Sequence, residues 1–106
     1  HVLGDKVAFV QKKFQHDSIS TAFMGIQGFS DTWVVEVIHP SDVCSDLKTQ
    51  ALTAVTALGL AFGGVDILIS MEDGKGYVAE VNTGPCLPTK KTREMYVDFF
   101  KQKLGL

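Results

Sequence analysis

Hydrophobic and polar residues alternate in two runs on either side of a short polar segment in the C-terminal half of the chain. The first run alternates Val65, Ile67 and Ile69 with Asp66, Leu68 and Ser70, and the second alternates Tyr77, Ala79 and Val81 with Val78, Glu80 and Asn82. The segment between them, 72–76, reads Glu-Asp-Gly-Lys-Gly, which are turn-forming residue types. This pattern predicts a β-hairpin in which each strand has one mostly apolar face.

The spacing of the polar residues indicates which register this hairpin adopts. Asp66 and Glu80 are separated by an even number of positions, so a loop of odd length can pair them directly in an antiparallel ladder. A loop of even length would put the two acids on opposite faces and divide the apolar residues between both. The pattern therefore favours a register that gathers Asp66, Glu80 and Asn82 on one face.

Two carboxylates and one amide on a single face, without histidine or cysteine nearby, would form a site made only of oxygen ligands. Such a donor set suits a hard cation such as Mg²⁺ or Mn²⁺ rather than zinc. Acidic residues are also common on solvated sheet faces. From spacing alone, a cation site and a solvated face are about equally supported.

The remaining elements follow from turn signals and periodicity. Gly4-Asp5 predicts a tight hairpin turn between a strand of at most three residues and a strand at 6–14. We expect a long loop at 15–31, a strand at 33–38, a helix beginning at 40–42, and a last helix from 89 or 90 to 103. The apolar stripe of the first helix is Val43, Leu47, Ala51, Ala54, Val55 and Leu58, with Gly59 at its C-terminal end; that of the second is Tyr96, Phe99, Phe100 and Leu104. The expected fold class is α+β, with an antiparallel sheet of about four strands and two helices packed on one face.

Composition limits the class of protein further. A chain of 106 residues is long enough for one domain, and 45% hydrophobic residues are enough for a core. The net charge of -2 and the lack of a basic patch argue against a nucleic-acid partner. No apolar run approaches the ~18 residues that span a bilayer, so we expect no membrane partner. Cys44 and Cys86 are expected to be free thiols in a reducing cytoplasm, with an isolated disulfide as the alternative.

The hairpin residues resemble a known family. The segments Gly64-Val65-Asp66-Ile67 and Glu80-Val81-Asn82-Thr83-Gly84-Pro85, with Ala57 to Leu60 before them, are similar to the C-terminal end of an ATP-grasp ligase domain, of the RimK-like or D-alanine–D-alanine ligase-like type. The likeness covers residues 41–88 well and the first strand loosely. It implies an ATP- and Mg²⁺- or Mn²⁺-dependent ligase that joins a carboxylate to an amine or thiol through an acyl-phosphate.

The resemblance also implies roles for single residues. Those matching Asp66, Glu80 and Asn82 would bind two divalent ions that bridge the ATP phosphates. A basic residue near Lys12 or Lys13 would contact the phosphates or the acyl-phosphate, and the choice between the two, or a solvated strand end, stays open. The loop Thr83-Gly84-Pro85 would approach a small carboxylate or amine substrate. The apolar residues Leu68 and Val78 would form walls for adenine.

Two features depart from the family pattern. Cys86 stands where a glycine usually follows the proline, which weakens the expectation of substrate binding at this loop. The half of the ATP cleft that precedes this segment in the family has no room in 106 residues. We therefore expect residues 1–106 to be a C-terminal ATP-grasp subdomain without its N-terminal portion. In isolation it should be inactive, should bind ATP weakly or not at all, and could self-associate through surfaces that truncation exposes. The alternative is a non-catalytic α+β binding or assembly module with solvated acids.

Overall fold

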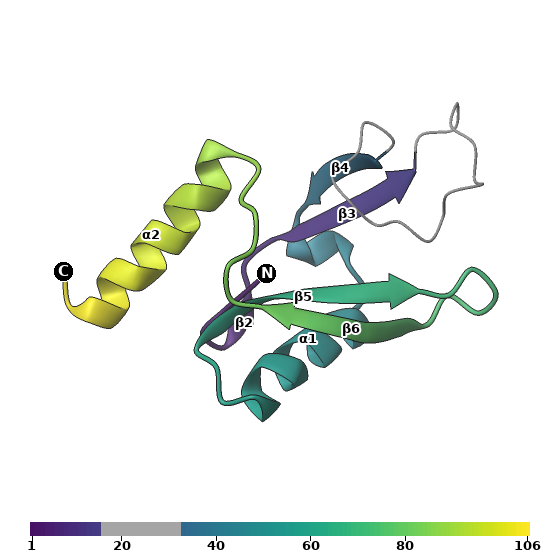
Figure 1. Cartoon of the computed structure of the whole chain (residues 1–106), viewed down its shortest axis with the longest axis horizontal. Coiled ribbons are helices and arrows are strands. Elements are labelled where there is room, and N and C mark those ends of the chain that lie inside the picture. The colour runs from purple at the N-terminus through teal and green to yellow at the C-terminus, as the bar shows by residue number, and fades with distance from the viewer. Residues whose placement is uncertain (16–32) are drawn as a thin grey trace.

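The computed structural model describes residues 1–15 and 33–106, and its elements form a four-stranded sheet, a separate two-stranded ribbon and two helices (Figure 1). The strands are β1 (Val2–Leu3), β2 (Lys6–Val7), β3 (Val10–Gln15), β4 (Trp33–Ile38), β5 (Phe62–Ile69) and β6 (Gly76–Asn82). The helices are α1 (Ser45–Ala57) and α2 (Lys90–Leu104), and Pro40–Asp42 forms one turn of 3-10 helix.

The larger sheet has the order β2-β1-β5-β6, and all its pairs are antiparallel. The β1–β2 hairpin turns at Gly4-Asp5, where Gly4 has a φ of 66°, a conformation that glycine adopts without steric cost. The predicted tight turn and the predicted α+β class with a four-stranded antiparallel sheet and two helices are both confirmed.

Helix α1 covers one face of this sheet. Val55, which is 1% exposed, and Ala51 pack against Val2 of β1, with Val65 and Ile67 of β5 around them. Gly59 follows the helix with a φ of 68°, as predicted for a C-terminal glycine. The α-helix begins at Ser45, later than predicted, because residues 40–42 form the 3-10 turn and Val43 is extended.

Helix α2 packs on the face of the four-stranded sheet opposite to the face that α1 covers. Tyr96 of α2 is 5% exposed and lies in a cluster with Leu3 and Phe9, bordered by Phe62 and Phe99. Val2 and Leu3 are consecutive in β1, so their side chains leave opposite faces and contact α1 and the α2 cluster respectively. We had expected both helices on one face, and this alternation at β1 separates them.

Strands β3 and β4 form a ribbon that lies above the β5–β6 hairpin in Figure 1. The strand predicted at 6–14 is therefore two strands, because Ala8 and Phe9 leave the sheet and Phe9 turns into the core at 3% exposure. The strand predicted at 33–38 is confirmed. Of the loop predicted at 15–31, Gln15 belongs to β3 and residues 16–31 lie outside the described part of the chain.

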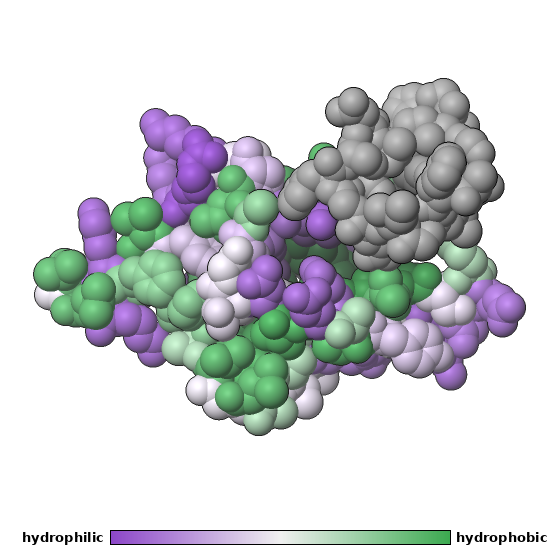
Figure 2. Space-filling view, viewed as in Figure 1, coloured by the Kyte–Doolittle hydropathy of each residue, from purple (hydrophilic) through white to green (hydrophobic). Residues whose placement is uncertain are grey.

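Exposed apolar side chains gather at the C-terminal ends of both helices (Figure 2). They include Leu58 after α1, and Leu104 and Leu106 at the end of α2. Cys44 and Cys86 are exposed free thiols, as expected. Within residues 1–15 and 33–106, neither helix combines the length and the apolar character needed to cross a membrane.

Candidate functional site

A β-bulge in the β5–β6 hairpin determines which side chains share a face. Ile69 pairs with Gly76 across a turn of six residues, 70–75, so the turn has an even length. An uninterrupted ladder from that turn would place Asp66 opposite Ala79. The bulge between Asp66 and Ile67 leaves Ala79 without a partner residue, and Asp66 pairs with Glu80 instead. The predicted pairing is confirmed, although the predicted odd-length loop is wrong.

The two acids therefore lie side by side on the face away from α1. Directly paired residues of an antiparallel ladder have Cβ atoms about 4.5–5.5 Å apart. Asp66 and Glu80 are both exposed, whereas their neighbours Val65 and Val81 pair with each other on the face that α1 covers. Hydrophilic side chains accordingly gather over the middle of the hairpin (Figure 2).

Asn82 continues this face and is linked to the loop that follows it. Asn82 pairs with Gly64, two positions along β5 from Asp66, and its Oδ1 accepts a hydrogen bond of 2.8 Å from the backbone N–H of Gly84. Pro85 folds back onto Gly64, where a Cβ would lie only 2.9 Å from Pro85 Cβ. The predicted substrate loop, 83–85, is thus anchored directly beside the acids, and Cys86 follows it in an exposed position.

The bulge also changes the apolar part of this face. Val78 pairs with Ile67 and lines a surface hollow with α1 residues such as Thr53 and Ala54. The prediction that Val78 shares the acidic face is therefore wrong. Tyr77 pairs with Leu68 and takes the place of Val78 on the acidic face. Tyr77 is 56% exposed and Leu68 is 51% exposed. Sequence alternation missed Tyr77 because nothing in it marks the extra residue of the bulge.

The ribbon distinguishes the two candidate lysines. Gln11 points toward the hairpin, since its Oε1 lies 2.8 Å from His1 Nε2. Lys13 shares the ribbon face of Gln11, because the two are separated by two positions along β3. Lys12 lies on the opposite face with Phe14, whose ring centroid is 5.8 Å from Lys12 Nζ. Of the two predicted cations, only Lys13 is on the face turned toward the acidic strands.

His1 borders the acidic face and was not identified from the sequence. Its ring stacks on Phe9 with centroids 4.1 Å apart, and its Cε1 would be 3.6 Å from a Cβ on Gly64. The α-amino group donates to Phe9 O at 2.8 Å. Burial lowers the pKa of this amine to about 6, and the negative charge of Asp66 opposes the shift. Asp66 is therefore close enough to His1 to interact with it electrostatically.

The donor atoms on this face fit a hard cation better than a soft one. Among the described residues, no group of three or more His, Cys, Asp and Glu side chains is placed to hold a metal ion, so this face offers two carboxylates and one amide. Two paired carboxylates with a neighbouring amide oxygen fit Mg²⁺ or Mn²⁺, which often take one or two protein carboxylates and complete their coordination with water and phosphate. Asn82 Oδ1 has a second lone pair left after bonding Gly84.

Comparisons with known proteins give no relative for this chain. No family model, no curated protein and no solved structure matches it.

Proposed function

We propose that this chain supplies the cation- and phosphate-binding half of an ATP-dependent carboxylate–amine or carboxylate–thiol ligase of the ATP-grasp type. Asp66, Glu80 and Asn82 would hold Mg²⁺ or Mn²⁺. The observation that carries the proposal is the direct Asp66–Glu80 pair on the face opposite α1, restored by a bulge where the even turn would otherwise separate the two acids.

The bulge is informative because it decides which side chains face α1 and which face solvent. It keeps Val81 opposite Val65 on the covered face, and it leaves Asp66 beside Glu80 on the exposed face. Bulges interrupt ladder hydrogen bonding and recur beside active sites, where they redirect side chains. Here it places two negative charges in neighbouring positions on an exposed face, an arrangement that is destabilising without a counter-ion. A bound cation would remove that repulsion.

The chemistry assigned to these residues is electrostatic. Bound divalent cations neutralise charge on the transferring phosphoryl group of ATP. Asp66 and Glu80 would fix the position of the cations, and Asn82 would orient them relative to the loop at 83–85, which would face the acceptor substrate. Lys13, on the ribbon face turned toward this surface, would balance phosphate charge.

The same face offers an apolar platform for the base of the nucleotide. Leu68 lies two positions beyond Asp66 in β5, a distance of about 6.6 Å along the strand. With its partner Tyr77 it presents half-exposed aliphatic and aromatic surface beside the acids. This pair replaces the predicted pair of Leu68 and Val78.

The proposal is tested by adding substoichiometric Mn²⁺ to isotopically labelled protein and recording amide spectra. Paramagnetic broadening should centre on residues 64–66 and 80–84. Replacing both acids by Asp66→Asn and Glu80→Gln should abolish the localised broadening, because the two anionic ligands are lost while the side-chain shapes are kept.

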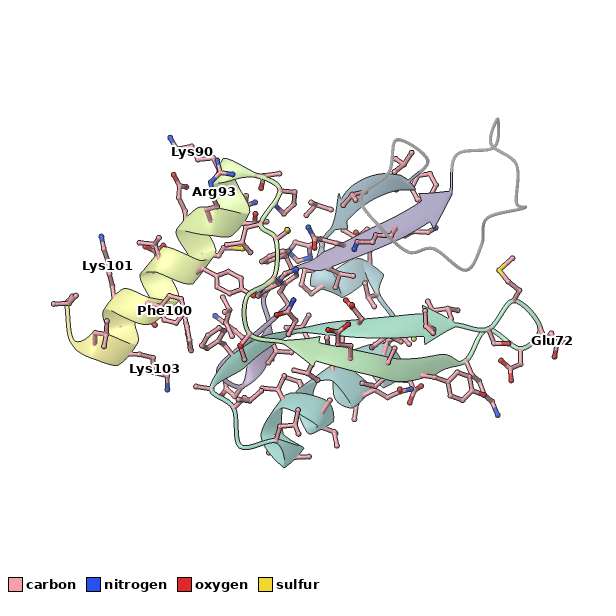
Figure 3. All side chains as sticks on the ribbon, in the orientation of Figure 1. Glu72, Lys90, Arg93, Phe100, Lys101 and Lys103 are labelled. Carbon is pink, nitrogen blue, oxygen red and sulfur yellow. The ribbon has the colours of Figure 1, made fainter. Side chains whose placement is uncertain are left out.

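A matched control removes two acids elsewhere. Glu72 lies at the tip of the β5–β6 turn (Figure 3) and Asp98 lies on α2, so Glu72→Gln with Asp98→Asn changes the net charge equally. The control should broaden like the parent chain. Broadening that is diffuse, or that survives loss of Asp66 and Glu80, would instead support a non-catalytic module with solvated acids.

A further inference from the structure

One imidazole connects three separate elements beside the candidate cation site. His1 Nδ1 lies 2.7 Å from the hydroxyl oxygen of Tyr96 on α2, and His1 Nε2 lies 2.8 Å from Gln11 Oε1 on β3. The edge of the ring between these two nitrogens rests on Gly64 of β5, next to Pro85. Helix, ribbon and hairpin therefore meet at this ring.

The partners determine how the ring is protonated. Gln11 Oε1 only accepts hydrogen bonds, so His1 Nε2 carries the proton and donates it. In a neutral ring protonated at Nε2, His1 Nδ1 accepts from the Tyr96 hydroxyl, and all three polar groups are satisfied. With both nitrogens engaged, the ring has no free lone pair with which to bind a metal.

We infer that His1 is a positioning residue for the Asp66–Glu80–Asn82 site, acting through Gly64 and the loop that starts at Asn82. The ring and Pro85 both rest on Gly64, which is the pairing partner of Asn82. Asn82 in turn bonds Gly84 in the same loop. Tyr96 and Gln11 hold the ring in place. Through the ring they would fix the position of the loop at 83–85 relative to Asp66 and Glu80. This inference rests on the proposed cation site.

The experiment measures Mn²⁺ affinity by titration of the paramagnetic broadening in four variants. Tyr96→Phe removes one hydroxyl, and His1→Phe keeps a ring for stacking on Phe9 but removes both nitrogens. Tyr96→Phe should weaken Mn²⁺ binding about 3- to 10-fold, the effect of one net hydrogen bond. His1→Phe loses the hydrogen bonds to both Tyr96 and Gln11, so it should weaken binding at least as much. The double variant should be no weaker than His1→Phe alone, because both changes break the same link.

The fourth variant, Phe100→Leu, separates positioning from simple loss of helix packing. Phe100 belongs to α2, as Tyr96 does, and packs on Phe62 of β5 with ring centroids 5.0 Å apart. Its side chain forms no hydrogen bond to His1. It should lower the melting temperature without changing Mn²⁺ affinity. Long-range ¹⁵N spectra of the His1 ring should show a protonated Nε2 in the parent chain and in Phe100→Leu.

The outcomes distinguish this inference from the proposal beneath it. If the parent chain shows no localised Mn²⁺ binding, the proposed function fails. If the parent binds and Tyr96→Phe and His1→Phe bind equally well, only the positioning role of His1 is wrong. The role is also wrong if Phe100→Leu weakens binding as much as Tyr96→Phe does, since helix docking alone would then explain the loss.

Discussion

Single residues around Gly64 decide how closely the parts of the candidate site approach one another. The glycine gives room to Pro85 and to the His1 ring, which come from distant positions in the chain. The sequence allowed us to assign Gly64 to the strand region and Asp66 to its polar face. It gave no sign that the space over Gly64 is filled, because that depends on a tertiary contact rather than on local pattern.

Adding one methyl group tests this close approach. Gly64→Ala should destabilise the chain by about 1–3 kcal/mol, because a Cβ would lie 2.9 Å from Pro85 Cβ and the loop must shift. Urea unfolding measures the change. Gly84→Ala is the control, since the nearest atom to its Cβ would be Asn82 Oδ1 at 3.8 Å. Equal stability of the two variants would mean that Pro85 does not rest on Gly64.

The ionisation of Tyr96 offers a second test at this scale. Burial raises the pKa of Tyr96 from 10.0 to about 12. The unfolded chain therefore loses this proton first, so the contribution of Tyr96 to stability is present below pH 10 and declines as the pH rises from 10 to 12. Absorbance at 295 nm should show a component near pH 12 that Tyr96→Phe removes. If Tyr96→Phe instead removes a component near pH 10, the hydroxyl is not buried.

Among the elements, the β5–β6 hairpin shows both the strength and the limit of period-two reasoning. Alternation correctly placed Asp66, Glu80 and Asn82 on one face, because the apolar residues between them must pack on α1. It assigned Val78 to the wrong face, because a bulge inserts one residue without any mark in composition. Reading across a bulge requires knowing where the turn closes, and the turn here has six residues, 70–75, rather than an odd number.

The two helices also differ at their first residues in a way that can be tested. Thr89 caps α2 and forms a reciprocal pair with Thr92, accepting from its N–H at 3.1 Å. Thr89→Ala should cost about 1 kcal/mol of unfolding free energy. Cys44 occupies the same position in α1 without a side-chain cap bond, so Cys44→Ala should change stability little when measured by the same urea unfolding. A loss of similar size in both variants would show that the Thr89 cap contributes nothing specific.

Across the whole molecule, two apolar clusters meet back to back at β1. Val2 belongs to the cluster under α1, and Leu3 belongs to the cluster with Phe9 and Tyr96. The α+β class, the sheet of four strands and most helix bounds followed from periodicity and turn residues. The ribbon and the position of α2 did not, because both depend on Phe9 leaving the strand run to fill the second cluster.

The ribbon should open more readily than the four-stranded sheet. Val35 and Val37 of β4 remain 39% and 42% exposed, and Phe14 of β3 is 39% exposed, so little apolar burial holds the two strands together. A two-stranded ribbon is only marginally stable without such packing. Backbone amides of β3 and β4 should therefore exchange with deuterium at least tenfold faster than those of β5 when followed by NMR.

Ligand should narrow this difference in exchange rate. If ATP and Mn²⁺ bind between the ribbon and the hairpin, exchange in β3 should slow in the unsubstituted chain but not in the variant with Asp66→Asn and Glu80→Gln. Ribbon amides that already exchange as slowly as those of β5 without ligand would mean that the ribbon is fixed in place, and that the chain reaches its binding geometry before any nucleotide arrives.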